Sequence, residues 1–536
     1  MQKKEFSLLD EPWIKVLTMG HETVEVSLKD LFANAHHYAC LAGETPTQDA
    51  ALIRFLLATA ETVFYRYEVD GEENLLCEEN GSDRDDVLDR WRDYYDKGAF
   101  EENVFSSYLE KYRDRFYLFH PETPFYQVAD LQYGTDFSAV NLYGNIKESN
   151  NPATKHHFSM NEGNNLKSIS LPEAARWLIH YNAYAVNVKK NNKAPGSGNP
   201  VGTGRMGRLG FIMADGENLF DTIMINLCAL RDGEMLWGKP KPAWEQPVCS
   251  LQAREIAIPD NIPEAYTIQS RRLLLKREND KICGIRALGG DYYPIENEVS
   301  EQMTLWKAKY DKKSNTKTEV PKTHDPSIHI WREFSTIICE DLKDTQKPRI
   351  PGLVKWLQVI MKNRQRLITF HTIGMKYDGM SYGFVESVND SLMMSSGLLL
   401  ELGNIWRARI ENEILNCRAA ADLLAQLSDD ISFIISGKDS KKRQSNSNNL
   451  TSYYYSSIDH EFRNWLLSID VNSQQYESKV IEWQNISKKI ALQIAENFVL
   501  LFSSEMFRTV NNSKTIPESL NEFIMKLNSI YAVKKA

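Results

Sequence analysis

Alternating apolar and polar positions near the start of the chain predict a β-hairpin. The alternation runs from Trp13 to Met19, breaks at Gly20-His21 and resumes from Glu22 to Ser27, as in two strands joined by a tight turn. Between Thr47 and Tyr67 the apolar residues recur instead at helical spacing, which predicts a helix with one face in a core. The N-terminal part of the chain therefore mixes strands and helices.

A second well-marked helix is predicted from Ser168 to Val188, because Ser170 can cap its N-terminus and Pro172 stands in its first turn. The composition then changes. Residues 189–210 hold five basic side chains, six glycines and no carboxylate, which predicts a long, mobile, basic loop. The elements expected next are a helix over 219–230, an irregular proline-rich region up to residue 325 and helices in two pieces between 328 and 362.

A projecting hairpin is predicted in the following segment. Two extended stretches, 367–376 and 380–388, flank the tripeptide Tyr377-Asp378-Gly379. A D-G pair between extended stretches is typical of a tight hairpin turn, because both turn positions need positive φ.

From residue 389 to the C-terminus the pattern is helical. Four helices are predicted, over residues 392–427, 460–469, 474–507 and 517–533, and four neighbouring helices suggest a bundle. The segment 437–452 is rich in Ser, Asn and Lys and is predicted to be a mobile linker. The predicted fold class is α+β, with a large mixed N-terminal domain over residues 1–388 and a C-terminal four-helix bundle over residues 389–536.

Net charge at first argues against a nucleic-acid partner. The 536 residues carry 63 basic and 72 acidic side chains, a formal charge of −9, whereas proteins that bind nucleic acids usually have a basic excess. Residues 66–110, however, hold fifteen acidic and five basic side chains, a charge of −10, so the rest of the chain carries +1. Because one segment holds the whole acidic excess, other surfaces are free to be basic.

No segment is typical of secretion, membrane insertion or metal binding. The first residues mix charged and apolar side chains, no apolar run approaches the ~20 residues of a membrane span, and the seven cysteines are never spaced as C-x-x-C. The pairs His36-His37 and His156-His157 lack the i, i+4 spacing of a zinc site. We therefore expect a cytoplasmic protein with no metal and no cofactor.

The hexapeptide from Gly202 to Gly207 fits G-x-G-x-x-G, and one hypothesis is a nucleotide-dependent enzyme that uses it. A dinucleotide fingerprint follows a strand and opens a helix, whereas this hexapeptide follows a polar loop and precedes the extended segment 209–214. A second hypothesis is close approach of the backbone to phosphates or a groove, with charge added by Arg205 and Arg208. A purely structural scaffold is a third. No hydrolase, kinase or metalloenzyme motif is present, so an enzyme is not expected.

A series of short motifs follows a fixed order along the chain. They are F-S-L-L-D-E-P-W-I-K-V (residues 6–16), H-P-E-T-P-F-Y-Q-V (120–128), N-P-A-T-K-H-H-F-S-M (151–160), L-P-E-A-A-R-W-L-I-H (171–180), the glycine-rich basic loop, Q-M-T-L-W-K (302–307), the hairpin at 367–388 and the terminal helices. In this order, across nearly the whole chain, the sequence resembles the CasA family, the large subunit of the type I-E Cascade, a CRISPR RNA-guided surveillance complex.

The resemblance implies a non-catalytic subunit in antiviral defence. In that family the large subunit grips the 5′ handle of the guide RNA (crRNA), recognises the protospacer-adjacent motif in double-stranded DNA, helps to open the duplex for R-loop formation and recruits a helicase-nuclease. The expected partners are therefore the other Cascade subunits, crRNA, target double-stranded DNA and the helicase-nuclease, with no membrane. Base pairing would read the target sequence while the protein reads a short motif and the backbone.

The same resemblance places the family's functional residues on this chain. Its DNA-contacting glycine loop falls on Gly202, Gly204, Arg205, Gly207 and Arg208, its wedge hairpin on Lys376, Tyr377, Asp378, Gly379 and Met380, and its guide-RNA foot loop on Asn151, Lys155, His156, His157 and Phe158. Two departures stand out. A glutamine that some members have at the wedge aligns with Gly379, and the family's lysine finger, expected between the glycine loop and the hairpin, has two candidates, Lys276 and Arg286.

Overall fold

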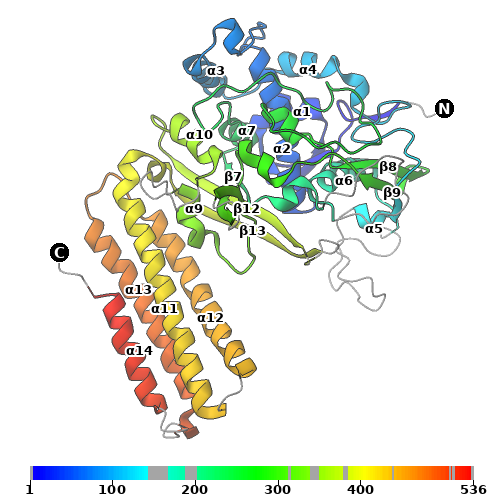
Figure 1. The fold of residues 1–536 in the computed structure, drawn as a ribbon. Helices are drawn as coiled ribbons and strands as arrows, with labels where there is room; N and C mark the ends of the chain where they lie inside the picture. Colours follow the sequence, from blue (N-terminus) through cyan, green and yellow to red (C-terminus); the bar gives the residue numbers. More distant parts are fainter. Residues whose placement is uncertain are drawn as a thin grey trace. The chain divides into compact units, whose positions relative to one another are not determined.

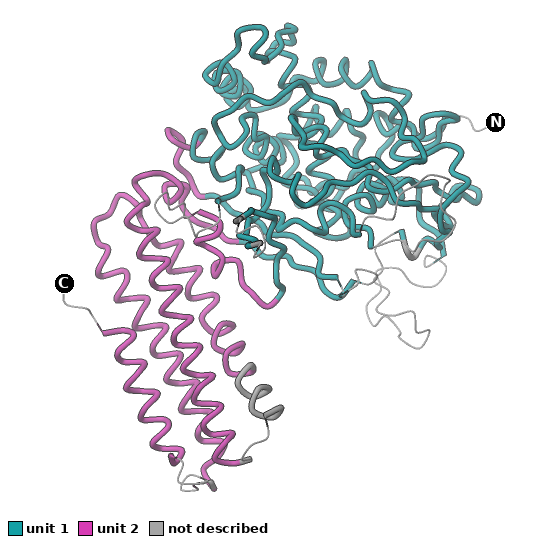
Figure 2. The backbone as a smooth tube through the Cα atoms, viewed as in Figure 1, with its two compact units in different colours: residues 1–326, 340–360, 368–391 teal, residues 327–339, 361–367, 392–536 magenta. Residues whose placement is uncertain are grey.

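Two compact units divide the chain (Figure 2). The computed structural model describes residues 4–142, 167–186, 202–311, 316–338, 349–377, 379, 384–436, 440–505, 509 and 514–532. Unit 1 comprises residues 1–326, 340–360 and 368–391, and unit 2 comprises residues 327–339, 361–367 and 392–536. The contacts thus separate the C-terminal helices from residue 392 onward and add two earlier segments to them.

Helices occur in both units, and the three longest described ones, α11, α12 and α13, belong to unit 2 (Figure 1). The described helices of unit 1 are α1 (Leu28–Asn34), α2 (Pro46–Arg66), α3 (Arg84–Lys97), α4 (Glu102–Glu110), α5 (Ala139–Leu142), α6 (Leu171–Tyr184), α7 (Leu219–Asn226), α8 (Ile262–Tyr266) and α10 (Gly352–Ile360). Those of unit 2 are α9 (Phe334–Ile338), α11 (Asn404–Ser436), α12 (Ser440–Leu467), α13 (Tyr476–Leu500) and α14 (Ile516–Ile530).

The described strands form small sheets in which the paired strands are antiparallel. Their orders are β1-β5, β3-β2-β4, β6-β9-β8, β10-β11 and β13-β12-β7. The strands are β1 (Glu5–Ser7), β2 (Ile14–Thr18), β3 (Thr23–Val26), β4 (Tyr38–Leu41), β5 (Tyr117–Phe119), β6 (Thr135–Ser138), β7 (Phe211–Asp215), β8 (Arg271–Glu278), β9 (Lys281–Gly289), β10 (Trp306–Asp311), β11 (Thr316–Pro321), β12 (Leu367–Tyr377) and β13 (Phe384–Ser395).

Local sequence explains the best-predicted elements. The hairpin is confirmed, because β2 pairs with β3 from Ile14↔Val26 to Leu17↔Thr23. Helix α6 begins as expected, since the Ser170 side chain accepts a hydrogen bond from the Glu173 amide and Pro172 occupies the first turn. The α+β prediction, with a mixed N-terminal part and C-terminal helices, is confirmed as well.

Helices α2 and α6 pack together in the interior of unit 1. An aromatic cluster lies beside α2, where the Phe55 ring meets Trp13, Phe125 and Trp244 at centroid separations between 5.5 and 6.3 Å. The H-P-E-T-P-F-Y-Q-V motif supplies Phe125, and its Gln127 side chain accepts a hydrogen bond from the Leu275 amide of β8. This motif therefore joins the helical core to the β6-β9-β8 sheet.

Unit 2 is a bundle in which α11 contacts each of α12, α13 and α14. Its interior includes a polar chain, because the Ser487 hydroxyl lies 2.7 Å from the hydroxyls of both Tyr454 and Tyr531. Large apolar side chains surround it, with the Trp465 and Trp483 rings stacked at 5.5 Å.

Predictions about three irregular segments were wrong in whole or in part. Of the loop predicted to be mobile over 189–210, residues 189–201 lie outside the described residues, whereas residues 202–210 are largely buried, because Gly204, Gly207 and Gly210 pack closely against neighbouring atoms. The predicted linker 437–452 is helical from Ser440 onward, as the start of α12. The region before residue 325 is not irregular, since it contains α8 and the strands β8 to β11.

Candidate nucleic-acid interface

The glycine segment, residues 202–210, connects the region after α6 to strand β7 and is held tightly. A Cβ atom on Gly204 would lie 2.5 Å from the carbonyl oxygen of Ala183, and one on Gly207 would lie 2.5 Å from the hydroxyl oxygen of Tyr377. The Gly204 amide donates to the Ala185 carbonyl at 2.8 Å. Gly204 and Gly207 thus allow a close approach of the protein's own backbone at Ala183 and of the Tyr377 ring. Within the segment 202–210, Gly202 is the glycine that combines a positive φ, 71°, with open space around its Cβ position.

Arg205, which the resemblance assigns to the DNA-contacting loop, does not face solvent. Its side chain is 4% exposed and forms ion pairs with Glu298 at 2.9 Å and Glu301 at 2.7 Å. Arg54 of α2 donates two further hydrogen bonds to Glu301, at 3.0 and 2.8 Å. Burial alone would raise the pKa of Glu301, but the charges of Arg54 and Arg205 lower it to about 2. Arg205 therefore anchors the glycine segment in the interior.

Arg208 is the more accessible of the two arginines. Its side chain is 27% exposed, donates to the Tyr293 carbonyl at 3.0 Å and lies 3.4 Å from Glu298. Desolvation lowers its pKa, but an arginine remains charged at neutral pH. The segment thus presents one partly exposed cation, Arg208.

The nucleotide-enzyme hypothesis is contradicted by the setting of the hexapeptide. A dinucleotide fingerprint lies between a parallel strand and a helix whose N-terminus receives the phosphates. Here a single 3₁₀ turn, Arg205–Arg208, leads into β7, and β7 pairs antiparallel with β12. The amides of Gly204 and Gly207 both donate to carbonyls of the chain itself, so they are not free to hold a phosphate.

The hairpin predicted from the D-G pair is formed by β12 and β13, which are neighbours in one sheet. The structure describes the first strand up to Tyr377 and the second from Phe384 onward. Between them it describes Gly379, which is exposed, so the type of turn stays a prediction. Asp378 and Met380 lie outside the described residues.

Tyr377 and Lys376, assigned by resemblance to the wedge, point to different surroundings. The Tyr377 hydroxyl donates to the Tyr184 carbonyl at 2.7 Å and its ring covers Gly207, so this side chain is turned toward the protein. The Lys376 side chain is 48% exposed and its Nζ lies 3.9 Å from Asp325. Of the two, Lys376 is the one placed to meet an external anion. The proposed guide-RNA residues Asn151, Lys155, His156, His157 and Phe158 all lie outside the described residues.

A basic two-stranded ribbon, β10-β11, was missed at the sequence level. Lys307, Lys309 and Tyr310 of β10 are exposed, Tyr310 to 63%. Paired residues of an antiparallel ribbon share a face, and the register Lys307↔Val320 and Lys309↔Thr318 puts both lysines on one face. The alternation W-K-A-K-Y and T-K-T-E-V was the pattern that could have revealed it.

The base of this ribbon is fixed in the core. Trp306 is buried and the Arg349 guanidinium lies 3.7 Å from its ring centroid. Cation–π contact of this kind stabilises a desolvated arginine. The ribbon therefore projects from a rigid base.

The ribbon, the glycine segment and the hairpin meet at their bases. The Leu305 amide donates to the Gly210 carbonyl at 2.9 Å, and a Cβ on Gly210 would lie 1.9 Å from the Lys322 carbonyl oxygen. Just after β11, the His324 ring donates from Nε2 to the Phe211 carbonyl at 2.8 Å and packs over Gly374 of β12. Three elements that are far apart in the sequence are thus joined within unit 1.

Neither predicted candidate for the lysine finger lies in this cluster. Lys276 and Arg286 project from the β6-β9-β8 sheet, where both pair with Asp136, at 2.6 and 2.7 Å. Their hydrogen bonds, and to a smaller extent their charges, hold the pKa of Asp136 well below its usual range. Both cations are therefore committed to a carboxylate, unlike the exposed lysines of the ribbon.

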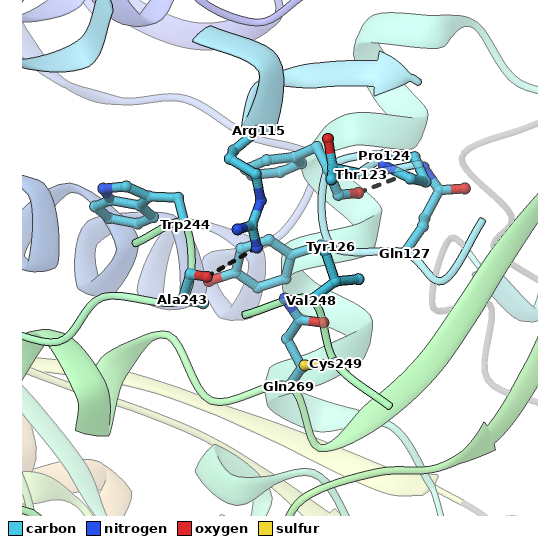
Figure 3. Close-up of a pocket in the computed structure, with 11 residues that line it drawn as sticks. Arg115, Thr123, Pro124, Tyr126, Gln127, Ala243, Trp244, Val248, Cys249 and Gln269 are labelled. Carbon is cyan, nitrogen blue, oxygen red and sulfur yellow. Dashed lines mark hydrogen bonds between the residues drawn. The ribbon is translucent and has the colours of Figure 1, made fainter. Parts of the chain in front are cut away.

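A small pocket borders the H-P-E-T-P-F-Y-Q-V motif (Figure 3). Arg115 crosses it, donating to the carbonyls of Ala243 and Gln246 at 3.0 and 2.7 Å, and Tyr126, Cys249 and Gln269 also line it. Its free volume of about 20 Å³ is enough for about one water molecule. This pocket is too small for a nucleotide or a peptide side chain, and the Arg115 guanidinium that crosses it is used in holding residues 243 and 246.

Two kinds of site are not found among the residues that the structure describes. No cluster of three or more His, Cys, Asp or Glu side chains there could hold a metal ion. In the same residues, no helix has the length and apolar character to cross a bilayer.

Comparison with known proteins identifies relatives along nearly the whole chain. The model of a family described as CRISPR-associated protein Cse1 matches residues 7–494. A curated relative, CRISPR-associated protein CasA/Cse1 of Thermus thermophilus, is 30% identical over 339 residues. That match covers 62% of this chain and 60% of the relative, so the chain aligns with less than two thirds of the relative's length.

Solved structures share the fold. The crystal structure of Thermobifida fusca Cse1 is 24% identical, with a TM-score of 0.81 and 98% of both chains covered. A chain of a structure described as a CRISPR RNA-guided surveillance complex is 15% identical, with a TM-score of 0.67, over 98% of this chain and all of that one. At these identities the likeness concerns the fold.

Proposed function

Because this chain belongs to the CRISPR-associated Cse1 family, we propose that it is the non-catalytic large subunit of a Cascade complex. In this role it binds the 5′ handle of crRNA, recognises a protospacer-adjacent motif in double-stranded DNA, helps to open the duplex and recruits a helicase-nuclease. Its partners are the other Cascade subunits, crRNA, target duplex DNA and the helicase-nuclease. The family membership supports the assignment, and the surface elements of unit 1 support the DNA contact.

The observation that carries the proposal is the junction of three DNA-directed elements. The glycine segment, the β10-β11 ribbon and the β12-β13 hairpin meet at Gly207, Gly210 and His324. Each contributes a cation at or near the surface: Arg208, the ribbon lysines and Lys376. A duplex that met one of these elements would therefore lie within reach of the others.

We assign the lysine finger of the family to the ribbon in place of Lys276 or Arg286. Lys307 and Lys309 share a face and are exposed, whereas Lys276 and Arg286 are paired with Asp136. A flexible lysine reaches phosphates and the minor groove as a point charge, and the minor groove offers a degenerate code. Recognition by these elements would be governed mainly by groove shape and the phosphate backbone.

The proposal is tested by reconstitution. A guide-RNA complex assembled without this subunit is mixed with the purified chain and with a library of target duplexes whose flanking positions are randomised. We expect the chain to restore tight binding to a subset of flanks, and binding to weaken steeply with salt, because phosphate contacts release counterions. The proposal fails if the chain adds no affinity, or if all flanks are bound equally.

A further inference from the structure

The end of α6 and the two residues that follow it, Tyr184 to Val186, accept hydrogen bonds from three separate elements. We call this region the joint. The last carbonyls of a helix have no partner within it and must be satisfied from outside. Here the Tyr184 carbonyl accepts from the Tyr377 hydroxyl at 2.7 Å, the Ala185 carbonyl from the Gly204 amide at 2.8 Å, and the Val186 carbonyl from the Arg271 guanidinium at 3.0 Å. The donors come from the hairpin, the glycine segment and β8.

Arg271 stabilises this joint through hydrogen bonds to the main chain. It is fully buried, and the same Nη2 that bonds Val186 also donates to the Gly202 carbonyl at 2.6 Å. One guanidinium therefore holds the backbone on both sides of the segment that enters the glycine hexapeptide. Carbonyls are its described hydrogen-bond partners, so its bonds serve to fix the backbone.

Tyr377 is the hairpin's own attachment to this joint. It is the last described residue of β12 before the tip, and its ring lies against Gly207 and, edge to face at 6.4 Å, against Phe384 where β13 begins. Burial raises the pKa of its hydroxyl well above the usual value, so the group remains a hydrogen-bond donor at any physiological pH. The glycine at 207 is required, because a Cβ there would occupy the place of the tyrosine ring.

We propose that Tyr377 is a positioning residue for duplex opening, which locks the base of the β12-β13 hairpin to the glycine segment through the end of α6. The inference rests on the proposed function, in which the glycine segment contacts the duplex and the hairpin separates its strands. A wedge between base pairs is pushed back by the tendency of the strands to re-pair. A hairpin that is attached to the element contacting the duplex stays in place when the strands tend to re-pair. A hairpin without this attachment would be displaced.

The test compares Tyr377→Phe with wild type in the reconstituted guide-RNA complex. Phenylalanine keeps the ring over Gly207 and removes only the hydroxyl. Two targets carry the same flanking motif: one is fully paired, and in the other the strands beside the motif are already separated by mismatches. We expect about fivefold weaker or slower binding to the paired target and less than twofold change on the opened one, because only the paired target needs the wedge.

A matched control is Tyr94→Phe. The Tyr94 hydroxyl also donates from a buried side chain to a main-chain carbonyl, that of Tyr67 at 3.1 Å, but it lies on α3 and not at the joint. Its loss should leave both targets bound as by wild type. If Tyr377→Phe weakens both targets equally, its role is structural and the inference is overturned; unchanged binding of the paired target overturns it too.

A double-mutant cycle with Gly207→Ala gives a second measurement. The alanine displaces the Tyr377 ring, so its effect on the paired target should be smaller in the Tyr377→Phe background than alone. Additive effects contradict the joint. Failure of the proposed function would instead show in the wild-type complex, as equal affinity for paired targets with and without the flanking motif.

Discussion

Arg205 and Glu301 form an ion pair at 2.7 Å in which neither side chain is more than 4% exposed. Glu301 also accepts two hydrogen bonds from the Arg54 guanidinium, so one carboxylate from a loop links an arginine of α2 to an arginine of the glycine segment, which Glu298 pairs as well. A buried charge that loses its partner is strongly destabilising. The pair therefore fixes the glycine segment to the helical core.

Glu301→Gln should lower the free energy of unfolding by about 3 kcal/mol or more, since two buried guanidiniums lose their shared countercharge. Denaturant unfolding at pH 7 measures this. The exposed pair of Arg92 and Asp89 provides a control, because Asp89→Asn should change the stability by less than about 0.5 kcal/mol. Equal stability of wild type and Glu301→Gln would show that the pair contributes nothing.

The same carboxylate predicts an acid transition. The pKa of Glu301 is lowered to about 2 in the folded protein from 4.5, so the stabilisation is complete above about pH 4.5 and is lost as the pH falls toward 2. Its size over that window is about 3 kcal/mol. Wild type should lose this stability on acidification and Glu301→Gln should not. Parallel pH profiles of the two proteins would contradict the assignment.

Substitution of the ribbon lysines should weaken DNA binding without affecting folding. Lys307→Ala and Lys309→Ala each remove an exposed cation, so the slope of log affinity against log salt should fall by about 1 for each phosphate that is no longer neutralised. Lys276→Ala is the matched control. Because Lys276 is paired with Asp136, this variant should leave the salt slope unchanged. The opposite pattern would return the lysine finger to the β6-β9-β8 sheet.

Gly204→Ala should destabilise the protein, by about 2 kcal/mol, because its Cβ would press on the backbone of Ala183. Loss of DNA binding in this variant would therefore not show that Gly204 touches DNA. Gly379→Ala is the control, since nothing lies within 4 Å of its Cβ position. Thermal unfolding should separate the two, and equal midpoints would mean that the close approach at Gly204 relaxes freely.

Glu61→Gln should stabilise the protein at neutral pH. Glu61 is buried in α2, its Oε2 lacks a partner among the described residues, and burial raises its pKa to about 8. The unfolded chain ionises this group above pH 4.5 whereas the folded protein keeps it protonated, so stability falls as the pH rises from 4.5 toward 8. The variant should gain about 3 kcal/mol at pH 7 and almost nothing at pH 4. A gain of the same size at both pH values would contradict this ionisation.

The elements that the sequence predicted well are those whose determinants are local. The turn at Gly20-His21 and the cap at Ser170 lie inside the elements they define. The start of α12 was missed because Ser and Asn, which are frequent in residues 440–452, have only modest helix propensities. These residues also show no apolar periodicity that would indicate a helix. Packing of later residues of α12, such as the buried Tyr454 and Phe462, stabilises the helix.

The burial of the glycine segment could not be predicted from its own residues. A run of glycines with arginines has the composition of an open basic loop, and the carboxylates that bury Arg205 stand 93 and 96 residues further along the chain. The contact that explains Gly207 comes from Tyr377, 170 positions away by the numbering. Contacts between residues so far apart in the sequence cannot be predicted from a short stretch of neighbouring residues.

The joint at the end of α6 has a consequence for how this region can evolve. Its acceptors are the main-chain carbonyls of Tyr184, Ala185 and Val186, which any amino acid would supply. Selection on the joint therefore falls on the donors, Tyr377 and Arg271, and on the glycines that admit them. The hydrogen bonds at the end of α6 therefore do not depend on which side chains stand there, and the hairpin and the glycine segment share a point of support that the main chain itself provides.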